Sequence, residues 1–242
     1  MSGKISVSLS LIIPVYNERE LIKPAIEHYL RVLSMDFADF EIILVDDGST
    51  DGSDKIIDEL AEKNGHIKVL HNLINLNLGI TIQRGMMVAT KEFVIFDGID
   101  LCLAPEDFAE IVSSLNDCDM LILERRSYPG CGVWRRITSM FNRLLLRILF
   151  GSRIRDMNFT FIYRRDITSK ILPLAKSPTF THPEMILRAE HIGLRVKSIK
   201  VDYHPRTSGK GAFGKSHDIL WTLYDMLRFR LKMWSGAIEK KG

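Results

Sequence analysis

The sequence predicts an α/β fold in which a mostly parallel β-sheet is flanked by helices. Short β-branched apolar runs alternate with segments of helical apolar spacing through the first 125 residues, as in parallel-sheet proteins. Acidic residues directly follow two of these runs, where parallel strands are expected to present ligand sites. The 242 residues, 46% hydrophobic and 26% charged, suit one globular domain or one domain with a short appendage.

The expected elements follow from these runs in chain order. Strands are predicted at residues 8–15, 41–45, 67–72, 92–96 and 120–123, because these runs are short, apolar and bounded by loop-forming residues. Helices are predicted at residues 20–33, 53–63, 79–89 and 105–115. Ser49 or Thr50 is expected to cap the second helix, and Pro105 suits the first turn of the fourth.

Two longer amphipathic helices are predicted after residue 125, at residues 134–150 and 219–234. The first has a basic stripe formed by Arg136, Arg143 and Arg147, and the second carries several aromatic side chains. One face of the second helix is expected to hold Thr222, Asp225, Arg228 and Lys232. Such helices can lie in a bilayer interface or can simply cover a sheet, and the pattern leaves both open.

The two halves of the chain carry opposite charge. Residues 1–120 hold 9 Lys/Arg against 21 Asp/Glu, whereas residues 121–242 hold 24 against 9. An acidic half suits cation chemistry, and a basic half suits an anionic partner such as phosphate or a membrane surface. The basic residues belong to no known nucleic-acid-binding module, so no nucleic-acid partner is expected.

Localisation is predicted from what the sequence lacks. No run of 18 apolar residues predicts a transmembrane helix, and Pro14 interrupts the first apolar run too early for a signal peptide. Cys102, Cys118 and Cys131 form an odd number without metal-ligand spacing, which is typical of reduced thiols. We expect a cytoplasmic protein that associates peripherally with the inner face of a membrane; the sequence predicts no oligomeric state.

Two motifs follow the first two predicted strands: Pro14-Val15-Tyr16-Asn17-Glu18 and Val45-Asp46-Asp47-Gly48-Ser49-Thr50-Asp51-Gly52. In order and setting, the two motifs resemble those of family 2 glycosyltransferases of the GT-A (Rossmann-like) fold. The chemistry agrees with the resemblance, because a fixed carboxylate such as Asp46 can accept N–H donors of a nucleotide base and Tyr16 can supply an aromatic surface. The resemblance implies a nucleotide-sugar donor bound by Pro14, Tyr16, Glu18, Asp46, Asp47, Gly79 and Arg84.

A third motif, Phe96-Asp97-Gly98-Ile99-Asp100, stands where this family has a D-x-D metal site. The resemblance implies that Asp97 and Asp100 hold Mg²⁺ or Mn²⁺, cations that prefer hard oxygen ligands. The spacing departs from the family pattern, because Gly98 occupies the position of the first acid and Asp97 lies one residue earlier.

The second half resembles the dolichyl-phosphate mannose synthase group, whose members transfer sugar to a polyprenyl monophosphate. The resemblance rests on residues 120–125, 136–139 and 183–188 and on a loose late signature, His204-Pro205-Arg206-Thr207-Ser208-Gly209-Lys210. It implies an acceptor phosphate site that includes Arg125, Ser139, Arg206 and Lys210. Residues 1–216 are then the GT-A domain, with a donor half at 8–125 and an acceptor half at 126–216, and 217–242 form a membrane-interfacial helix.

The expected activity is inverting transfer of a sugar from a GDP-mannose or UDP-hexose type of donor to polyprenyl or dolichyl phosphate. Asp100, Asp97 and Glu184 are the candidate catalytic residues. A phosphate acceptor is already ionised at neutral pH, whereas a hydroxyl acceptor would require a base such as Asp100 or Glu184. Two alternatives stay open: a family 2 transferase acting on a glycan hydroxyl in surface polysaccharide assembly, and a degenerate nucleotide-binding protein without activity.

Overall fold

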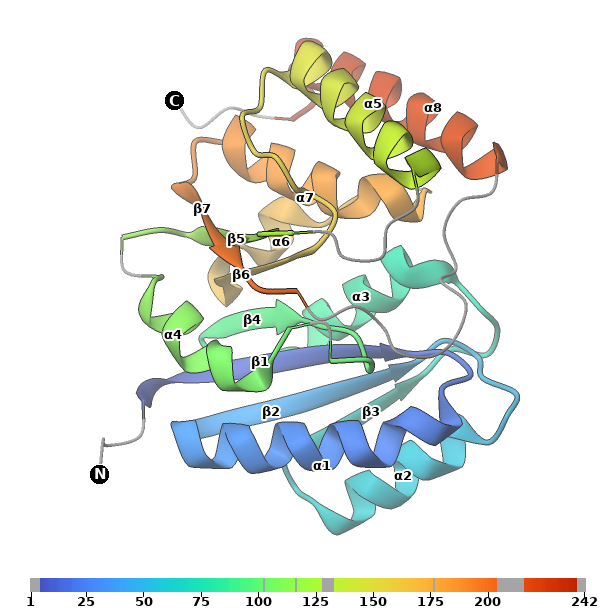
Figure 1. Ribbon diagram of the computed structural model, residues 1–242, viewed down its shortest axis with the longest axis vertical. Coiled ribbons are helices and arrows are strands. Elements are labelled where there is room, and N and C mark those ends of the chain that lie inside the picture. The colour runs from blue at the N-terminus through green and yellow to red at the C-terminus, as the bar shows by residue number, and fades with distance from the viewer. Residues whose placement is uncertain are drawn as a thin grey trace.

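A computed structural model describes residues 5–101, 103–115, 117–127, 133–175, 177–203 and 216–238, without the side chains of 133–136 and 216–218 (Figure 1). The strands are β1 (Ile5–Val15), β2 (Phe37–Asp46), β3 (Ile67–His71), β4 (Phe93–Phe96), β5 (Met120–Arg125), β6 (Thr160–Arg164) and β7 (Val196–Val201). The α-helices are α1 (Arg19–Asp36), α2 (Ser53–Lys63), α3 (Asn77–Val88), α4 (Phe108–Ser113), α5 (Val133–Phe150), α6 (Thr168–Ile171), α7 (Pro178–His191) and α8 (Ser216–Trp234). Two 3-10 turns, η1 (Pro105–Asp107) and η2 (Arg165–Ile167), precede α4 and α6.

The strands form one mixed sheet in the order β3-β2-β1-β4-β6-β5-β7. Strands β1 to β4 run parallel, and β5 and β7 are parallel to each other. Only β6, among the strands described, runs antiparallel to its neighbours β4 and β5. The carboxyl ends of β1, β2 and β4 therefore meet at one edge, marked by their arrowheads in Figure 1.

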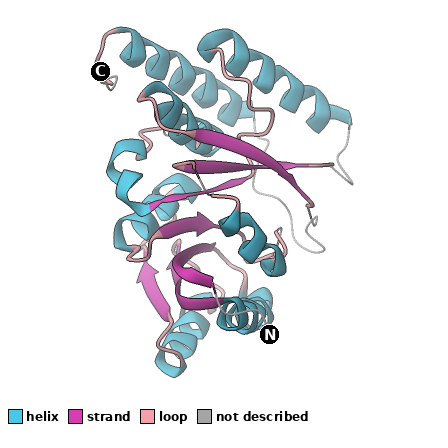
Figure 2. Cartoon of the chain, turned by 90° about the vertical axis from the view of Figure 1, so that its left-hand side faces the viewer, coloured by secondary structure: helices cyan, strands magenta, loops and turns pink. Residues whose placement is uncertain are grey.

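Alternating side chains of the central strands build a core on each face of the sheet. Leu11 and Ile13 of β1 pack with α1, α2 and α4 on one face. Ile12, between them, packs with α3, α5, α7 and α8 on the other face. The edge-on view in Figure 2 shows these helices on either side of the strands. Since every central strand is buried on both faces, its sequence is a continuous apolar run.

The predicted α/β class and all five predicted strands are confirmed, whereas β6, β7 and α7 were missed. The strand β7 has exposed and half-buried residues at most positions, so it lacks an apolar run. The helix α7 begins with two prolines, Pro178 and Pro183, in its first six residues and is buried nearly all round. A helix buried on every side shows no amphipathic period, which removes the signal that sequence analysis uses.

The structure shows which face of α8 is turned toward the protein. Thr222 and Asp225 are buried beneath the helix, against Ser177 at the start of α7. The Oδ2 of Asp225 accepts the Ser177 N–H at 2.7 Å, and the hydroxyls of Ser177 and Thr222 are 2.6 Å apart. Aromatic and aliphatic side chains of α8 consequently face outward. Among the described residues, no helix has both the length and the apolar character needed to cross a membrane.

Candidate active site

The strand ends bring most of the predicted donor residues to one edge of the sheet. Tyr16 follows β1 and is 47% exposed, whereas Asp46 ends β2 and is almost fully buried beside it. The β1–β2 register pairs Pro14 with Val45 and Val15 with Asp46, so the two motifs are adjacent. Asp97 follows β4 on the other side of β1. Adjacent parallel strands thus collect acidic and aromatic groups where α/β proteins bind ligands.

Hydrogen bonds between the first two motifs tie their loops together. Asn17, held at φ 54°, accepts the Thr50 N–H through Oδ1 at 2.8 Å, and its own N–H donates to Ser49 Oγ at 3.0 Å. The Glu18 N–H donates to Ser53 Oγ at 3.0 Å. We term the edge formed by the carboxyl ends of β1, β2 and β4 the donor edge, after the donor residues predicted there. The hydrogen bonds between its loops hold the loops in one arrangement, which favours a preorganised site.

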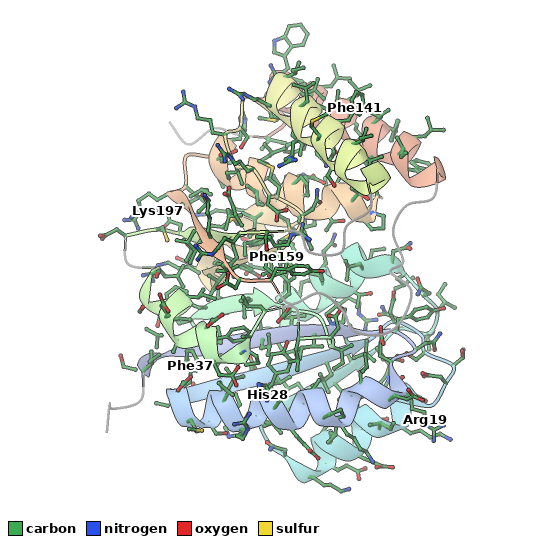
Figure 3. All side chains as sticks on the ribbon, viewed as in Figure 1. Arg19, His28, Phe37, Phe141, Phe159 and Lys197 are labelled. Carbon is green, nitrogen blue, oxygen red and sulfur yellow. The ribbon has the colours of Figure 1, made fainter. Side chains whose placement is uncertain are left out.

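The predicted cap of α2 is wrong by two or three residues. Gly52 occupies the N-cap position, and neither Ser49 nor Thr50 caps the helix. Instead, Asp51 Oδ1 accepts the Ser53 N–H at 3.0 Å and the Ser53 hydroxyl at 2.6 Å. These bonds hold the pKa of Asp51 below its ordinary value against the opposing effect of burial. Asp51 also accepts the N–H of Arg19 (labelled in Figure 3), so it joins α1 to α2.

Asp46 keeps acceptor capacity toward the edge. Its Oδ1 accepts the Ser49 N–H at 3.1 Å, and its Oδ2 lies 3.4 Å from Nδ1 of His71. An ionised carboxylate has about four lone-pair sites, so these two contacts leave room for a further donor. Asp46 therefore has the chemistry that the sequence predicted for base recognition.

Asp47 faces inward and organises the loop that follows β3. Its Oδ1 accepts the Asn72 side-chain N–H at 2.7 Å and the Leu76 N–H at 2.8 Å. Arg84 holds the same loop from α3, donating to the His71 carbonyl at 3.0 Å and to Asn72 Oδ1. Asp47 and Arg84 thus shape the donor edge by positioning its loop.

Gly48 makes this close approach possible. It has φ +74°, and a Cβ there would lie 2.7 Å from the backbone carbon of Ile74 and 2.9 Å from the Asn75 nitrogen. A residue with a side chain would be strained and would push the loop away. The glycine in the motif is therefore required by packing between the second motif and the loop after β3.

Asp97 is a buried carboxyl rather than an open one. Its Oδ2 accepts the Tyr29 hydroxyl at 2.8 Å, and its Oδ1 accepts the Gly98 N–H at 2.8 Å. The residue is only 5% exposed, and burial raises its pKa to about 7 despite the hydrogen bond from Tyr29. Asp97 therefore anchors α1 to the end of β4.

Asp100 is the half-buried acid of this segment. Its Oδ1 occupies the space that a Cβ on Gly98 would need, so an acid at position 98 would displace it. Among the residues that the structure describes, no group of three His, Cys, Asp or Glu side chains could hold a metal ion. Asp100 is the more exposed of the two predicted ligands, and the Asp97–Asp100 pair stays a prediction.

Arg125, predicted to bind phosphate, is held in a buried ion pair. Its Nε and Nη2 donate to the two Asp156 oxygens at 2.7 and 2.9 Å, and the Arg125 side chain is 14% exposed. The guanidinium also lies 5.2 Å from the ring centre of Phe159 and 5.3 Å from that of Tyr203. Figure 3 shows Phe159 in the middle of the molecule, between the two halves. Arg125 thus ties β5 to the segments before β6 and after β7.

Glu184 is used within the packing of α7. It accepts two N–H groups of Arg188 at 3.0 and 2.6 Å, and it accepts the Leu174 N–H at 2.9 Å. Its carboxylate is 3% exposed, so a base role would require these bonds to break. Glu184 therefore contributes to the packing of α7 in this fold, and its catalytic role stays a prediction.

The other predicted residues lie in three different settings. Gly79 is buried in the first turn of α3, where a Cβ would lie 2.7 Å from Thr181 Oγ1 of α7. Ser139 is exposed on α5, and its carbonyl accepts Arg143 Nε at 3.4 Å. Arg206 and Lys210 lie outside the described residues.

Three residues at this edge were not singled out by sequence analysis. Tyr29 reaches Asp97 from α1, and His71 reaches Asp46 from β3. His182 of α7 is buried, and its ring centre lies 4.5 Å from that of Phe96; burial lowers its pKa to about 4. Each partner is 25 to 86 residues away along the chain, so no local pattern connects them.

Comparisons of sequence and fold show that this chain is similar to enzymes that transfer sugars. The family described as Glycosyl transferase family 2 matches residues 10–172. The undecaprenyl-phosphate 4-deoxy-4-formamido-L-arabinose transferase of Aeromonas hydrophila is 26% identical over 223 residues, which cover 90% of this chain and 66% of that protein. The dolichol-phosphate mannosyltransferase of Saccharomyces cerevisiae is 29% identical over 152 residues, which cover 60% of this chain and 57% of that protein. The chain thus spans 66% and 57% of the length of these two relatives, less than two thirds in each case.

A solved structure shows the same fold at low identity. Glucosyl-3-phosphoglycerate synthase from Mycobacterium tuberculosis, in complex with Mn²⁺, uridine diphosphate and phosphoglyceric acid, aligns with a TM-score of 0.67 and 17% identity. The alignment covers 93% of this chain and 78% of that one. The predicted GT-A class of the sheet is thereby confirmed.

Proposed function

Because this chain belongs to glycosyl transferase family 2, we propose that it transfers a sugar from a nucleotide-sugar to the phosphate of a polyprenyl phosphate, with inversion at the sugar carbon. The observation that carries this proposal is the shared edge at the ends of β1, β2 and β4, where Tyr16, Asp46 and Asp100 gather. The curated relatives that act on undecaprenyl and dolichol phosphate support the choice of acceptor.

The donor is proposed to lie along this edge with its base toward Asp46. Tyr16 offers an exposed aromatic surface, and Asp46 offers a charged acceptor for a base N–H. Loops tied by Asn17 and Asp47 hold these groups in place. A site organised before binding spends less interaction energy on ordering itself.

A divalent cation, Mg²⁺ or Mn²⁺, is proposed to bind Asp100 together with oxygens of the donor diphosphate. When bound, such a cation neutralises charge that builds up on the leaving nucleoside diphosphate. The solved relative with Mn²⁺ and uridine diphosphate supports this cofactor. Asp97 is not proposed as a ligand, because its buried carboxyl joins α1 to the end of β4 through the Tyr29 hydroxyl.

The reaction needs no strong base if the acceptor is a phosphate monoester. A phosphate oxygen forms the bond to the anomeric carbon, and the bond from that carbon to the diphosphate oxygen breaks. The acceptor is already ionised at neutral pH, so positioning and charge stabilisation suffice. A glycan hydroxyl would need a free base, but Glu184 is engaged with Arg188 and Asp100 is proposed to bind the cation, so the phosphate acceptor is favoured.

The outer surface of α5 and α8 supports an acceptor that resides in a membrane. The two helices lie side by side as the layer farthest from β2 in Figure 1 and pack against each other. Each carries a stripe of exposed apolar side chains at helical spacing, which together we term the outer stripe: Ile137, Met140, Phe141, Leu144 and Ile148 on α5, and Leu220, Tyr224, Leu227, Leu231 and Trp234 on α8. Figure 3 shows Phe141 on this outer surface.

The basic residues beside the outer stripe favour an anionic bilayer as the surface that it contacts. Arg143 and Arg147 border it on α5, and Arg230 borders it on α8, all exposed. The described side chains of both helices include no exposed acid, since Asp225 is buried. Apolar burial combined with basic flanks is typical of helices that lie in a membrane interface. We therefore propose peripheral association with the cytoplasmic face of an anionic membrane.

The activity is tested with a panel of labelled nucleotide-sugars and a polyprenyl phosphate, followed by extraction into organic solvent. Label in the lipid phase is the expected result. Label only in a water-soluble glycan would overturn the lipid acceptor, and donor binding without turnover would overturn the activity.

The membrane surface is tested with the double variant Arg143→Glu/Arg147→Glu in vesicle sedimentation. A contribution of about 1 kcal/mol per basic residue predicts at least a tenfold loss of affinity for anionic vesicles. The matched control is Lys63→Glu/Lys197→Glu, which changes the net charge equally at exposed positions on α2 and β7. Equal losses in both variants would contradict a role of α5 and would indicate only net charge.

A further inference from the structure

The end of β3 holds a histidine between two carboxylates. Nδ1 of His71 lies 3.4 Å from Asp46 Oδ2, and Nε2 lies 3.0 Å from Asp58 Oδ1 of α2. The Asp46 side chain is 4% exposed, whereas those of His71 and Asp58 are 40% and 53% exposed. The imidazole thus connects a buried acid of the donor edge with a surface acid.

Both ring nitrogens face acceptors, so only the protonated ring can donate to both. Burial lowers the pKa of His71, but the hydrogen bonds to Asp58 and Asp46 outweigh it, and the pKa is raised above its ordinary value. The backbone of His71 is held from α3, where Arg84 donates to the His71 carbonyl at 3.0 Å. The arrangement therefore favours an imidazolium beside Asp46.

The contact to Asp46 is looser than the contact to Asp58. Charge-assisted N–H···O bonds usually measure about 2.7–2.9 Å, so 3.4 Å leaves the Nδ1–H able to turn toward another acceptor. Asp58 meanwhile restrains the ring from its other side. A ligand at Asp46 would thus meet a negatively charged acceptor and, next to it, a positively charged donor.

We propose that His71 and Asp46 together select a keto nucleobase in the donor, uracil or guanine, with Asp58 as the positioning residue for His71. Uracil and guanine present a ring N–H beside a carbonyl oxygen, which matches a carboxylate beside an imidazolium. Cytosine and adenine have an unprotonated ring nitrogen and an amino group at these positions. The lone pair of the ring nitrogen would face the Asp46 carboxylate, and the amino N–H would face the N–H of the His71 imidazolium, so both contacts would be repulsive. This inference rests on the proposed function, in which Asp46 meets the base of the donor.

The test is calorimetric binding of UDP, GDP, CDP and ADP, with Mg²⁺ present, between pH 6 and pH 8. The wild-type protein should bind UDP or GDP at least about tenfold more tightly than CDP and ADP, as expected for hydrogen bonds to charged groups. This preference should shrink as the pH rises and His71 loses its proton. Protonation of the diphosphate affects all four ligands alike, so the ratio of affinities isolates the base.

Four variants sharpen the measurement. His71→Ala should lose about tenfold of the preference with CDP affinity unchanged, and His71→Arg should keep the preference but lose its pH dependence. Asp58→Asn should shift the midpoint of that dependence to lower pH, because one of the carboxylates that stabilise the imidazolium becomes neutral. His28→Gln is the matched control, because His28 of α1 is a half-buried histidine with Nε2 3.0 Å from Glu106 Oε1; His28 is labelled in Figure 3.

The outcomes separate this inference from the proposed function. Wild-type protein that binds none of the four diphosphates would overturn both. Binding with a keto-base preference that His71→Ala leaves unchanged would overturn the role of His71 and leave the proposed function standing. An equal loss for all four ligands in His71→Ala would likewise overturn base selection, because it would indicate only a structural role.

Discussion

The charged residues at the donor edge of β1–β4 and those of the basic half, residues 121–242, have different partners. In the donor edge, motif residues bind one another across loops, as Asn17 binds Thr50, and Asp46 retains open acceptor capacity. In the basic half, Arg125 and Arg188 form ion pairs with Asp156 and Glu184 inside the protein, respectively. Other basic residues border the outer stripe. The contrast teaches that a net charge of one sign in part of a chain does not by itself form a phosphate pocket.

The largest expected effect separates the two acids at the end of β4. Asp100→Asn should lower kcat by at least about a hundredfold, since cation-assisted departure of the leaving group is worth several kcal/mol. Asp97→Asn should leave Mn²⁺ affinity unchanged, because its carboxyl contacts Tyr29 and Gly98. Mn²⁺ binding followed by electron paramagnetic resonance, beside turnover, checks both; loss of Mn²⁺ binding in Asp97→Asn would return that residue to the metal site.

The next largest effect is expected on stability, where it tests whether Arg125 has a structural role. Arg125→Ala should lower the free energy of unfolding by about 3–5 kcal/mol, because it removes the guanidinium that pairs with the buried Asp156 carboxylate. Arg126→Ala, which removes an exposed pair with Asp202, should cost less than about 1 kcal/mol. Denaturant unfolding of both variants measures the difference; a stable Arg125→Ala protein with weakened acceptor binding would favour the phosphate role instead.

A smaller effect is expected at the base-binding acid. Asp46→Ala should weaken nucleoside diphosphate binding by about ten- to a hundredfold, since it removes a charged hydrogen-bond acceptor worth about 1.5–3 kcal/mol. Circular dichroism should show an intact fold. Unchanged affinity in calorimetry would remove Asp46 from the donor site and would break the contrast between the two halves.

The smallest expected effect is the pH dependence of stability contributed by His71. Its pKa is raised in the folded state, so its contribution is full below the unfolded pKa of about 6.5 and is lost as the pH rises through the folded value. The difference in unfolding free energy between wild type and His71→Gln should therefore decline with rising pH and stay under about 1 kcal/mol, because the side chain is 40% exposed. A constant difference across pH 5 to 9 would contradict the ion-pair geometry.

The sequence alone determined the α/β class, the five strands of greatest apolar character and the acidic loops that follow them. It could do so because the signals are local: a strand buried on both faces is a run of consecutive apolar residues, and a turn that needs glycine has glycine at a fixed position. Gly48 illustrates this, since its position in the motif matches its close contact with Ile74. The candidate residues Tyr16 and Asp46 were brought together by the register of β1 and β2.

Only the tertiary structure decided which charges remain available. The burial of Asp97 under Tyr29, the pairing of Arg125 with Asp156 and the inward turn of Asp225 depend on partners 31 to 68 residues away along the chain. Local patterns record a residue's neighbours in sequence, whereas a pKa, an ion pair or an exposed apolar stripe depends on what packs against it in space. The same reason explains why His71, unremarkable in a short strand, lies between two carboxylates in the fold.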